Sequence, residues 1–500
     1  MQFYPKAREQ RPSIHHPSVR PRRLGVLKAA TVNLLLLQAL FLGLFCYIFG
    51  SLFQQTGHIH NINVLFVDYD GGAIGDAARA TFQKLKGPDF PTFIEQSASV
   101  YPQPGSIEGA VCDIKYWGAL YVTANASNAL SAAFAGGLAA SSYDKNNVLT
   151  MVWNEARYPT VIDSVLAESI KSLSETARVA YFQTNGNNSL QHINSSDSAA
   201  LATFYEPWTL ANNNIQPTSQ GSRVIYNTLV IILILIQEFF YLGTINGLYA
   251  QFNLYTSLSA RRIASGRLII SLIYTLIGAM CTAGAIWAFR SGWDVNGNQF
   301  ALTWLVLWLF AHLNFLVLDI FTIWLPPPYV PMALISWIIT NITSILLPFE
   351  LAPAFYKIGF ALPAHAVFQV LIDIWSFGCN PKLYYALPVL FVYEVLGIIL
   401  STIGVYRRAH YACIKQEMDE KALQEKVTAT ILEQQEAHLV RRETTRDTQG
   451  SKTSDSGNEE ADAQAELANI IHREMSRPKV ERPSTSRDNT GPSFALAYRD

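Results

Sequence analysis

Five long apolar runs in the C-terminal half of the chain constrain the fold more than any other feature. They cover residues 224–249, 268–289, 300–325, 332–348 and 383–406, and none contains a lysine or an arginine. A helix needs about 20 apolar residues to cross a hydrocarbon core about 30 Å thick. Buried helices of soluble proteins are usually shorter and carry a polar face. The runs therefore predict an integral membrane protein with a five-helix block over residues 223–408.

A sixth apolar run, at residues 29–53, stands apart near the N-terminus. The basic stretch before it resembles the start of a signal peptide, but the apolar region of a signal peptide is only about 7–15 residues long and ends at a small-residue cleavage site. Here the run continues to Phe53-Gln54-Gln55, which is a poor cleavage site. We predict a retained first transmembrane helix and six transmembrane helices in total.

The distribution of basic residues predicts that both ends of the chain are cytoplasmic. Residues 1–28 hold seven lysines and arginines against the single acid Glu9, and more arginines follow the second and the last predicted spans. Lysine and arginine accumulate in cytoplasmic segments, and with six spans these segments fall on one side. We expect residues 1–28 to be disordered, and residues 409–500 to form a helix-prone segment followed by a disordered tail.

Residues 54–222, between the first two predicted spans, are long enough for a domain with its own core. Because they follow a single span, we expect them on the extracytoplasmic side. Runs rich in β-branched and aromatic residues predict strands at residues 63–70, 116–122 and 147–154. Helix-like patterns cover residues 73–85 and 160–183. This alternation predicts an α+β domain with a mixed sheet and covering helices.

Two patterns concern the chemistry of this predicted outer side. Three N-glycosylation sequons begin at Asn125, Asn187 and Asn194, as in a glycoprotein of a eukaryotic secretory pathway. Of the five cysteines, only Cys112 and Cys379 are expected outside the membrane and the cytosol. A disulfide between them and two free thiols both remain open, because sequence cannot supply the geometry that a disulfide needs.

Residues 348–375 predict an irregular outer segment. Prolines at positions 348, 353 and 363 interrupt an otherwise apolar stretch, and proline ends helices. A broken hairpin that re-enters the membrane fits this pattern better than another full span, provided that protein or water covers its backbone.

Acidic residues inside the predicted spans are the main candidates for function. Glu238 and Glu394 lie mid-span, and Asp319 lies toward the cytoplasmic end of its span. Ionisable groups at such depth cost about 2.5–3.5 kcal/mol and usually face a bundle interior or water. No lysine or arginine lies within any span to neutralise them, so we expect them to be protonated or hydrogen-bonded to Asn33, Gln38, Asn314 or His312.

These acids admit two explanations. Polar contacts between helices would account for them without any activity. Alternatively, Glu238, Glu394, Asp319 and His312 take part in substrate binding or proton coupling.

Other classes of function find little support in the sequence. The metalloprotease HExxH, serine hydrolase GxSxG and Walker signatures are missing, and GGAIG at residues 71–75 lacks the Lys-Ser/Thr of a phosphate-binding loop. The chain also lacks the basic patch that nucleic acid requires. We therefore expect no enzyme, no catalytic residues, no metal site, no cofactor and no nucleic-acid partner.

Three motifs carry a family resemblance: VDYDGGAIG at residues 67–75, YWGALYVTANASNAL at 116–130, and LPFELAPAFYKIGFALPAHAVFQV at 347–370. In this order, and over about residues 21–410, they resemble the fungal nitrosoguanidine-resistance membrane protein family. The layout is also similar to the bacterial phage-infection-protein group and, more distantly, to the permease fold of type-2 ABC (ABC-2) transporters. The resemblance implies drug or chemical resistance at the plasma membrane, with export or altered lipid distribution.

The expected protein is thus an α-helical polytopic membrane protein, similar to an ABC-2 permease, with an extracytoplasmic α+β domain between helices 1 and 2. It would transport or redistribute amphipathic compounds or lipids, with membrane lipids as partners and a homodimer expected only by analogy with that permease fold. The alternative is a non-transporting regulator or scaffold whose outer domain senses a ligand.

Overall fold

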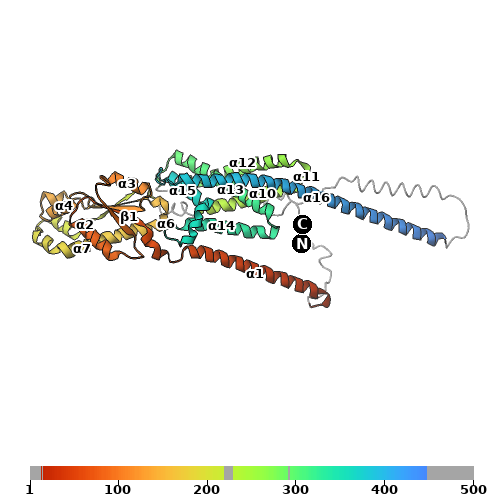
Figure 1. Cartoon of the computed structure of the whole chain (residues 1–500), viewed down its shortest axis with the longest axis horizontal. Helices are drawn as coiled ribbons and strands as arrows, with labels where there is room; N and C mark the ends of the chain where they lie inside the picture. The colour runs from red at the N-terminus through yellow and green to blue at the C-terminus, as the bar shows by residue number, and fades with distance from the viewer. Residues whose placement is uncertain (1–12, 14, 219–228, 291–292, 447–500) are drawn as a thin grey trace, which may run out of the picture. The chain divides into compact units, whose positions relative to one another are not determined.

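The computed structural model describes residue 13 and residues 15–218, 229–290 and 293–446. The first residues of the predicted second span and most of the predicted disordered tail lie outside this part of the chain. The described chain is mostly helical, with one five-stranded sheet placed in the sequence between its first two long apolar helices (Figure 1).

Six helices in the described residues are long and apolar enough to cross a membrane. They are α1 (Arg20–Ser51), α10 (Val230–Gln251), α12 (Ala260–Ala288), α13 (Gly297–Trp324), α14 (Val330–Leu346) and α16 (Leu383–Arg446). A further pair, η8 (Ala354–Ala361) and α15 (Pro363–Trp375), passes the same test together but bends by 78°. These helices confirm the prediction of a multi-pass α-helical membrane protein.

Several helices extend beyond the apolar runs that predict them. Helix α1 begins at Arg20 with Pro21 in its first turn, a position where the missing N–H of proline costs nothing. The prediction of disorder was therefore wrong for residues 20–28, and residues 1–12 lie outside the described chain. Helix α12 likewise begins at Ala260, and α16 continues to Arg446. Hydropathy identifies only the apolar part of a helix, whereas backbone hydrogen bonding continues into polar flanks.

The sheet belongs to the segment between α1 and α10, which we call the sheet domain (residues 55–218). Its strand order is β2-β1-β3-β4-β5, with β3 and β4 antiparallel and the other neighbours parallel. The strands are β1 (Asn63–Asp68), β2 (Thr92–Gln96), β3 (Gly118–Val122), β4 (Leu149–Trp153) and β5 (Leu210–Asn214). The prediction of a mixed sheet is confirmed.

Helices cover both faces of this sheet. On one face, Val64 and Phe66 of β1 belong to a core shared with α2 (Ala73–Leu85) and α7 (Glu168–His192). On the other face, Leu65 and Val67 pack with α3 (Pro104–Cys112). Alternate residues of a strand point to opposite faces, which explains why the buried run of β1 shows no polar alternation.

The two outer strands, β2 and β5, are absent from the sequence-based prediction. Both stand at the ends of the sheet and carry mostly polar residues, TFIEQ and LANNN. An edge strand needs an apolar face less than a central strand does, so its composition gives little signal. The predicted helix at residues 160–183 is also divided, into α6 (Pro159–Ile162), a π-helical turn η5 (Asp163–Ala167) and α7.

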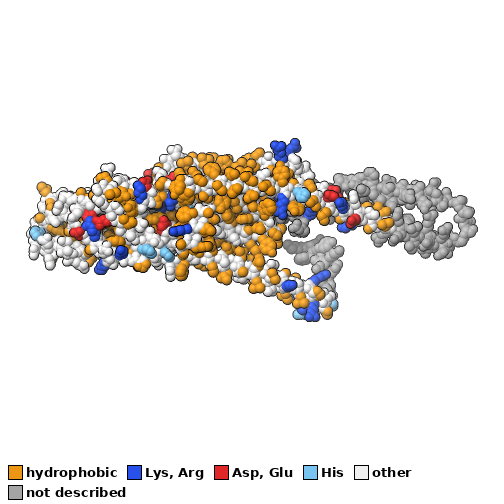
Figure 2. Space-filling view, viewed as in Figure 1, with side chains coloured by type: hydrophobic (Ala, Val, Ile, Leu, Met, Phe, Trp, Pro, Cys, Tyr) orange, Lys and Arg blue, Asp and Glu red, His pale blue; other side chains and the backbone are white. Residues whose placement is uncertain are grey.

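Shorter elements complete the described chain. They are η2 (Pro17–Val19), η3 (Gln55–Asn61), α4 (Ala126–Phe134), α5 (Leu138–Ser141), η4 (Glu155–Arg157), α8 (Ser198–Tyr205), α11 (Leu254–Ser257) and η7 (Pro327–Tyr329). Hydrophobic side chains cover most of the visible surface of the long helices, whereas the visible surface of the sheet domain is more polar (Figure 2).

The chain divides into two compact units, which we describe separately. Unit 1 comprises Met1–Gln237, Thr275–Asn314 and Pro328–Leu396, and unit 2 comprises Glu238–Tyr274, Phe315–Pro327 and Gly397–Asp500. The sheet domain, α14 and α15 therefore belong to unit 1 in full, whereas α10, α12, α13 and α16 each contribute to both units.

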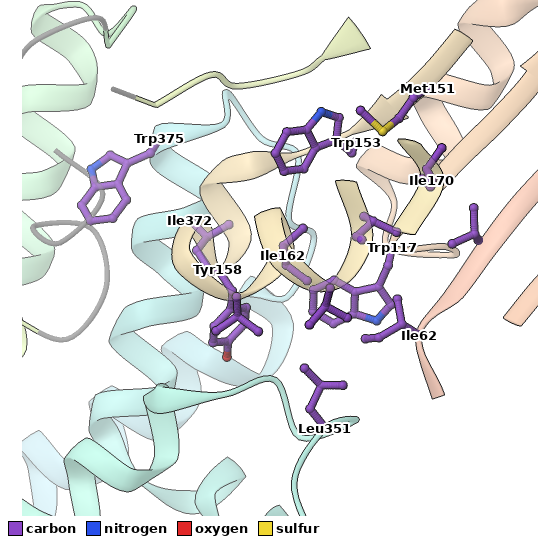
Figure 3. Close-up of a cluster of buried hydrophobic side chains, with 14 of the residues drawn as sticks. Ile62, Trp117, Met151, Trp153, Tyr158, Ile162, Ile170, Leu351, Ile372 and Trp375 are labelled. Carbon is purple, nitrogen blue, oxygen red and sulfur yellow. The ribbon is translucent and has the colours of Figure 1, made fainter. Parts of the chain in front are cut away.

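Within unit 1, the core of the sheet domain continues into the helical segments. Tyr158 packs edge-on against Phe368 of α15, with ring centroids 5.1 Å apart. Around Tyr158 lie Ile162 of α6, Ile372 of α15 and Leu351, which precedes η8 (Figure 3). One hydrophobic core thus joins the sheet domain to α15 and the loop before it.

Candidate functional site

A histidine and a glutamate from two apolar helices meet inside unit 1. His312 of α13 and Glu394 of α16 are hydrogen-bonded, with Nδ1 and Oε1 2.6 Å apart. The side chain of His312 is 2% exposed and that of Glu394 is 14% exposed. Because imidazole and carboxylate both exchange protons, such a pair can gain or lose a proton without large movement.

The second carboxylate oxygen of this pair is available to another group. Glu394 Oε2 is buried and has no hydrogen-bond partner among the described residues. Asn314, another partner that the sequence predicts for the acids, instead accepts a hydrogen bond from Trp337 Nε1 at 2.9 Å. Of the hydrogen-bond partners that the sequence predicts for Glu394, the structure shows His312.

Glu238 is the second mid-span acid, and it lies in unit 2. It is fully buried, and neither carboxylate oxygen has a hydrogen-bond partner among the described residues. A buried polar group without a partner costs free energy, so Glu238 remains a candidate for a proton or a ligand group.

The third acid, Asp319, has a different environment from the one that the sequence predicts. In unit 2, Asp319 Oδ1 accepts hydrogen bonds from Arg267 at 2.9 Å and from Arg408 at 3.1 Å. Ser401 donates to Oδ2 at 2.6 Å. The expectation that no basic residue could neutralise the acids was wrong for Asp319, because α12 and α16 extend past their apolar runs and carry the two arginines.

Two glycines allow this cluster to form. A Cβ at Gly397 of α16 would lie 2.8 Å from Leu316 Cβ of α13, and one at Gly404 would overlap with the side chain of Ile323. The absence of side chains at positions 397 and 404 therefore lets α16 approach α13 closely on both sides of Asp319. These contacts account for the burial of Asp319 by packing between helices. Its part in substrate binding or proton coupling stays a prediction.

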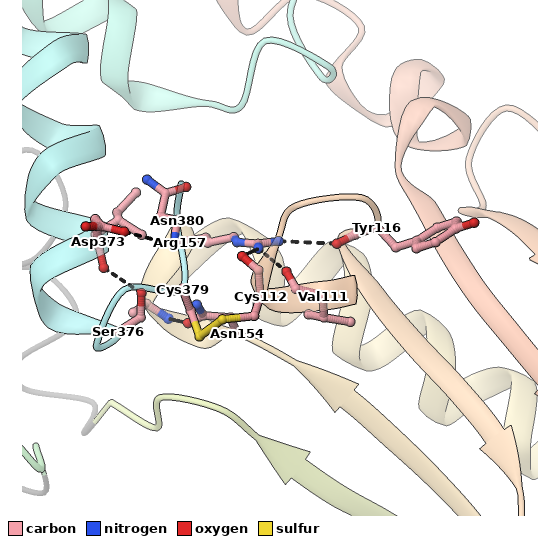
Figure 4. The surroundings of a disulfide bond; sticks show 11 residues. Val111, Cys112, Tyr116, Asn154, Arg157, Asp373, Ser376, Cys379 and Asn380 are labelled. Atoms are coloured by element: carbon pink, nitrogen blue, oxygen red, sulfur yellow. Dashed lines mark hydrogen bonds between the residues drawn. A yellow bond between two sulfur atoms is a disulfide. The ribbon is translucent and has the colours of Figure 1, made fainter. Parts of the chain in front are cut away.

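Cys112 and Cys379 form a disulfide in unit 1, between the end of α3 and the loop after α15 (Figure 4). Beside it, the buried guanidinium of Arg157 donates to the carbonyl oxygens of Val111 and Cys112. Burial lowers the pKa of Arg157 to about 10. Arg157 was missed by sequence reasoning, because nothing in its local sequence distinguishes it from a surface arginine.

The segment between α14 and α16 contacts the sheet domain at both of its ends. Asn61 Nδ2 donates to the carbonyl oxygen of Glu350 at 3.0 Å, and Cys379 carries the disulfide to Cys112. Between these two points lie η8 and α15, with their 78° bend. The segment thus leaves and returns to one domain.

The aspartates of the VDYDGG motif have structural partners. Asp68 accepts hydrogen bonds from the backbone N–H groups of Asp70 and Gly71, and its other oxygen pairs with Arg79 at 2.7 Å. Asp70 accepts from Ser127. These contacts close the turn after β1, where Gly71 has a φ of 60°. No group of His, Cys, Asp and Glu suited to a metal ion occurs among the described residues.

The three sequon asparagines lie on the sheet domain. Asn125 precedes α4, Asn187 lies within α7, and Asn194 follows it. All three side chains are exposed. Their glycosylation stays a prediction.

A protein-family model matches most of the chain. Residues 33–399, well over half of the chain, match the family described as "Protein of unknown function (DUF3533)". The match runs from α1 through the sheet domain into α16 and includes His312 and Glu394. No solved structure gives a significant match to the chain. The chain therefore belongs to the DUF3533 family of proteins of unknown function.

Proposed function

We propose that this protein moves amphipathic compounds or lipids outward across the plasma membrane and that the pair His312–Glu394 couples this movement to a proton. The hydrogen bond between these two side chains is the observation that carries the proposal. Ionisable side chains inside apolar helices cost free energy, so they are usually paired with one another or take part in function. Here they partner each other and leave one carboxylate oxygen, Oε2, without a partner among the described residues.

The family resemblance in the three motifs supports the class of substrate. It points to chemical resistance, as in the nitrosoguanidine-resistance proteins, and to a permease similar to those of type-2 ABC transporters. Because the sequence carries no Walker motif, the proton is the energy source that this chain's own residues favour.

The proposed topology has six spans, both termini in the cytoplasm and the sheet domain outside. It is supported by the basic residues near the N-terminus. It is also supported by the contacts of Glu350 and Cys379 with one domain. A segment that leaves and rejoins the same domain is expected to re-enter the membrane rather than cross it, so η8 and α15 would add no seventh span.

Transport by the purified full-length protein in lipid vesicles tests the proposal. Fluorescently labelled phosphatidylcholine and rhodamine 6G would serve as probes, each with and without a pH gradient that is acidic on the side of the sheet domain. We expect the gradient to accelerate movement of at least one probe severalfold. Glu394→Gln keeps the shape of the side chain but cannot titrate, so it should remove the effect of the gradient.

The matched control is Asp294→Asn, which changes an exposed acid outside the six candidate helices. This variant should respond to the gradient as the wild type does. A wild type that moves neither probe under any gradient, or a Glu394→Gln variant with an unchanged response, would refute the coupling role.

A non-transporting sensor is the second candidate, and one observation favours it. The sheet domain shares a core and a disulfide with the segments around α15, so a ligand bound to that domain could act on helical segments of the same unit. Vesicles that show no transport, together with cells in which this protein changes the activity of another transporter, would support this candidate.

A further inference from the structure

We propose that the sheet domain binds an amphipathic organic cation in a groove between α7 and the strands β4 and β5. The groove has a volume of about 690 Å³. This falls within the range of about 300–1,000 Å³ that is usual for small-molecule sites. Its lining comes entirely from unit 1 and does not include His312 or Glu394.

The floor of the groove is apolar and aromatic. Met151 and Trp153 of β4 and Trp208 are part of it, and each is at most 5% exposed. Both indole N–H groups are satisfied: Trp153 donates to Asn212 at 2.7 Å, and Trp208 donates to Ser174 at 3.2 Å. The floor therefore presents apolar side chains and no free indole donor, which suits an aromatic or aliphatic body.

The rim of the groove carries the charge that selects the ligand. Glu168 and Glu175 of α7 are both exposed and both line the groove. They stand seven residues apart, about two helical turns, so they lie on one side of the helix. Neither side-chain carboxylate has a hydrogen bond or ion pair within the described part of the chain. Their negative charge is therefore open to a ligand.

The other charged residues at the rim leave the net charge of the groove negative. Glu206 is paired with Lys145 and lies 3.9 Å from Arg178, and the hydrogen bond from Lys145 lowers the pKa of Glu206. Lys171, between the two free glutamates on α7, compensates only one of them. Asp163 adds a further carboxylate to the lining.

A cation with an apolar body satisfies both parts of the groove. Its charged nitrogen or phosphorus centre would lie near Glu168 and Glu175, and its body would lie against the apolar floor. This site goes beyond the proposed transport, since it would serve a sensor equally well.

Two probes of the same shape and opposite charge test the inference. Tetraphenylphosphonium is a cation and tetraphenylborate an anion, and both are bulky and aromatic. Binding would be measured by equilibrium dialysis with the full-length protein in lipid discs, without a pH gradient and against the same discs without protein. We expect saturable binding of the cation and none of the anion.

Variants that remove charges of opposite sign should change cation binding in opposite directions. The double variant Glu168→Gln/Glu175→Gln should weaken cation binding by about three- to tenfold, as expected for two exposed charges. Lys171→Gln should strengthen it, because it removes the one positive charge between them. Asp89→Asn, a change at an exposed acid outside the groove, should leave binding unchanged.

The result is separable from the transport proposal. Glu394→Gln should bind the cation as the wild type does, even if it no longer responds to a pH gradient. Equal binding of the two probes, no saturable binding of the cation, or an unaffected double variant with an unchanged melting temperature would each overturn the inference.

Discussion

The carboxylate of Asp319 lies 2.9 Å from the guanidinium of Arg267 in the buried interior of unit 2. Asp319 is fully buried and the side chain of Arg267 is 4% exposed, so water screens their attraction only weakly. A second buried arginine, Arg408, shares the same oxygen. The acid that hydropathy marks as isolated is therefore the centre of a charge cluster that joins α12, α13 and α16.

Removing this acid should destabilise the protein strongly. Asp319→Ala leaves two buried guanidinium groups without their shared counter-charge, and such a change costs about 3–5 kcal/mol. Thermal unfolding in detergent, followed by size-exclusion chromatography, would measure the loss. Asp294→Asn, at an exposed acid, should unfold at the wild-type temperature. An Asp319→Ala variant as stable as the wild type would contradict the structural role given to this cluster.

The contact between α13 and α16 should depend on its glycines. A Cβ at Gly404 would overlap with the side chain of Ile323, so Gly404→Ala is expected to destabilise by about 1–3 kcal/mol through overpacking. A Cβ at Gly284 of α12 would have no atom within 4 Å, and Gly284→Ala should be neutral or stabilising by up to about 1 kcal/mol. Ile323→Ala, added to Gly404→Ala, should recover part of the loss. Equal melting temperatures for the two alanine variants would contradict this packing.

The disulfide between Cys112 and Cys379 should contribute measurably to stability. It closes a loop with a sequence separation of 267 residues, and removal of a native disulfide typically costs about 2–5 kcal/mol. We expect Cys112→Ser/Cys379→Ser to melt at a lower temperature than the wild type, and a reducing agent to lower only the wild-type value. Cys413→Ser, at an unpaired cysteine, should behave as the wild type. Insensitivity of the wild type to reduction would argue against the bond.

Asp197 should make the sheet domain sensitive to acid. Its carboxylate accepts hydrogen bonds from the N–H groups of Gly137 and Ala199, and the bond from Gly137 is the main reason that its pKa is lowered from 3.8. Because the folded-state pKa is below the unfolded one, this stabilisation is present above the unfolded pKa and is lost as the pH falls through the folded one.

The measurement compares melting temperatures of the wild type and Asp197→Asn at two pH values. At pH values well above 4, the wild type should melt at a higher temperature than Asp197→Asn. The difference between the two melting temperatures should shrink in more acidic solution. A difference that is the same at both pH values would show that the charge of Asp197 does not matter.

Glycosylation tests the proposed topology. Asn125, Asn187 and Asn194 are exposed on the sheet domain, so at least one should carry a glycan when the protein is made in a eukaryotic host. Treatment with an endoglycosidase should increase the gel mobility of the wild type, whereas Asn125→Gln/Asn187→Gln/Asn194→Gln should not respond. The proposed orientation would be reversed by two results together. The enzyme would leave the wild type unchanged, and a protease site inserted in this domain would be cleaved only from the cytosol.

The sequence predicts the helical spans well because the membrane requires long apolar runs. It predicts their ends poorly, since a helix continues into polar residues as long as its backbone bonds are made. This is why the hydropathy pattern places Arg267 and Arg408 outside the membrane helices. Their pairing with Asp319 depends on three helices meeting, and hydropathy contains no information about which helices are neighbours.

The same limit applies to the sheet domain and to the candidate site. The central strands β1 and β4 are buried on both faces and are visible as apolar runs, whereas the polar edge strands β2 and β5 are not. Glu394 is conspicuous in the sequence as a mid-span acid. The hydrogen bond of Glu394 with His312, rather than with another polar residue, depends on the rotation of α13 and α16 about their axes. Helix packing sets this rotation.

The disulfide also constrains how the protein is made. On the ribosome, Cys112 is synthesised long before Cys379, which is followed directly by the last long helix, α16. During this interval the thiol at position 112 has to remain unreacted while four long apolar helices are produced and inserted. The sheet domain also lacks α15, which supplies part of its hydrophobic core. Maturation of this domain therefore ends only when nearly the whole membrane part has been translated, and nascent chains that stop earlier should be recognised by chaperones as unfinished.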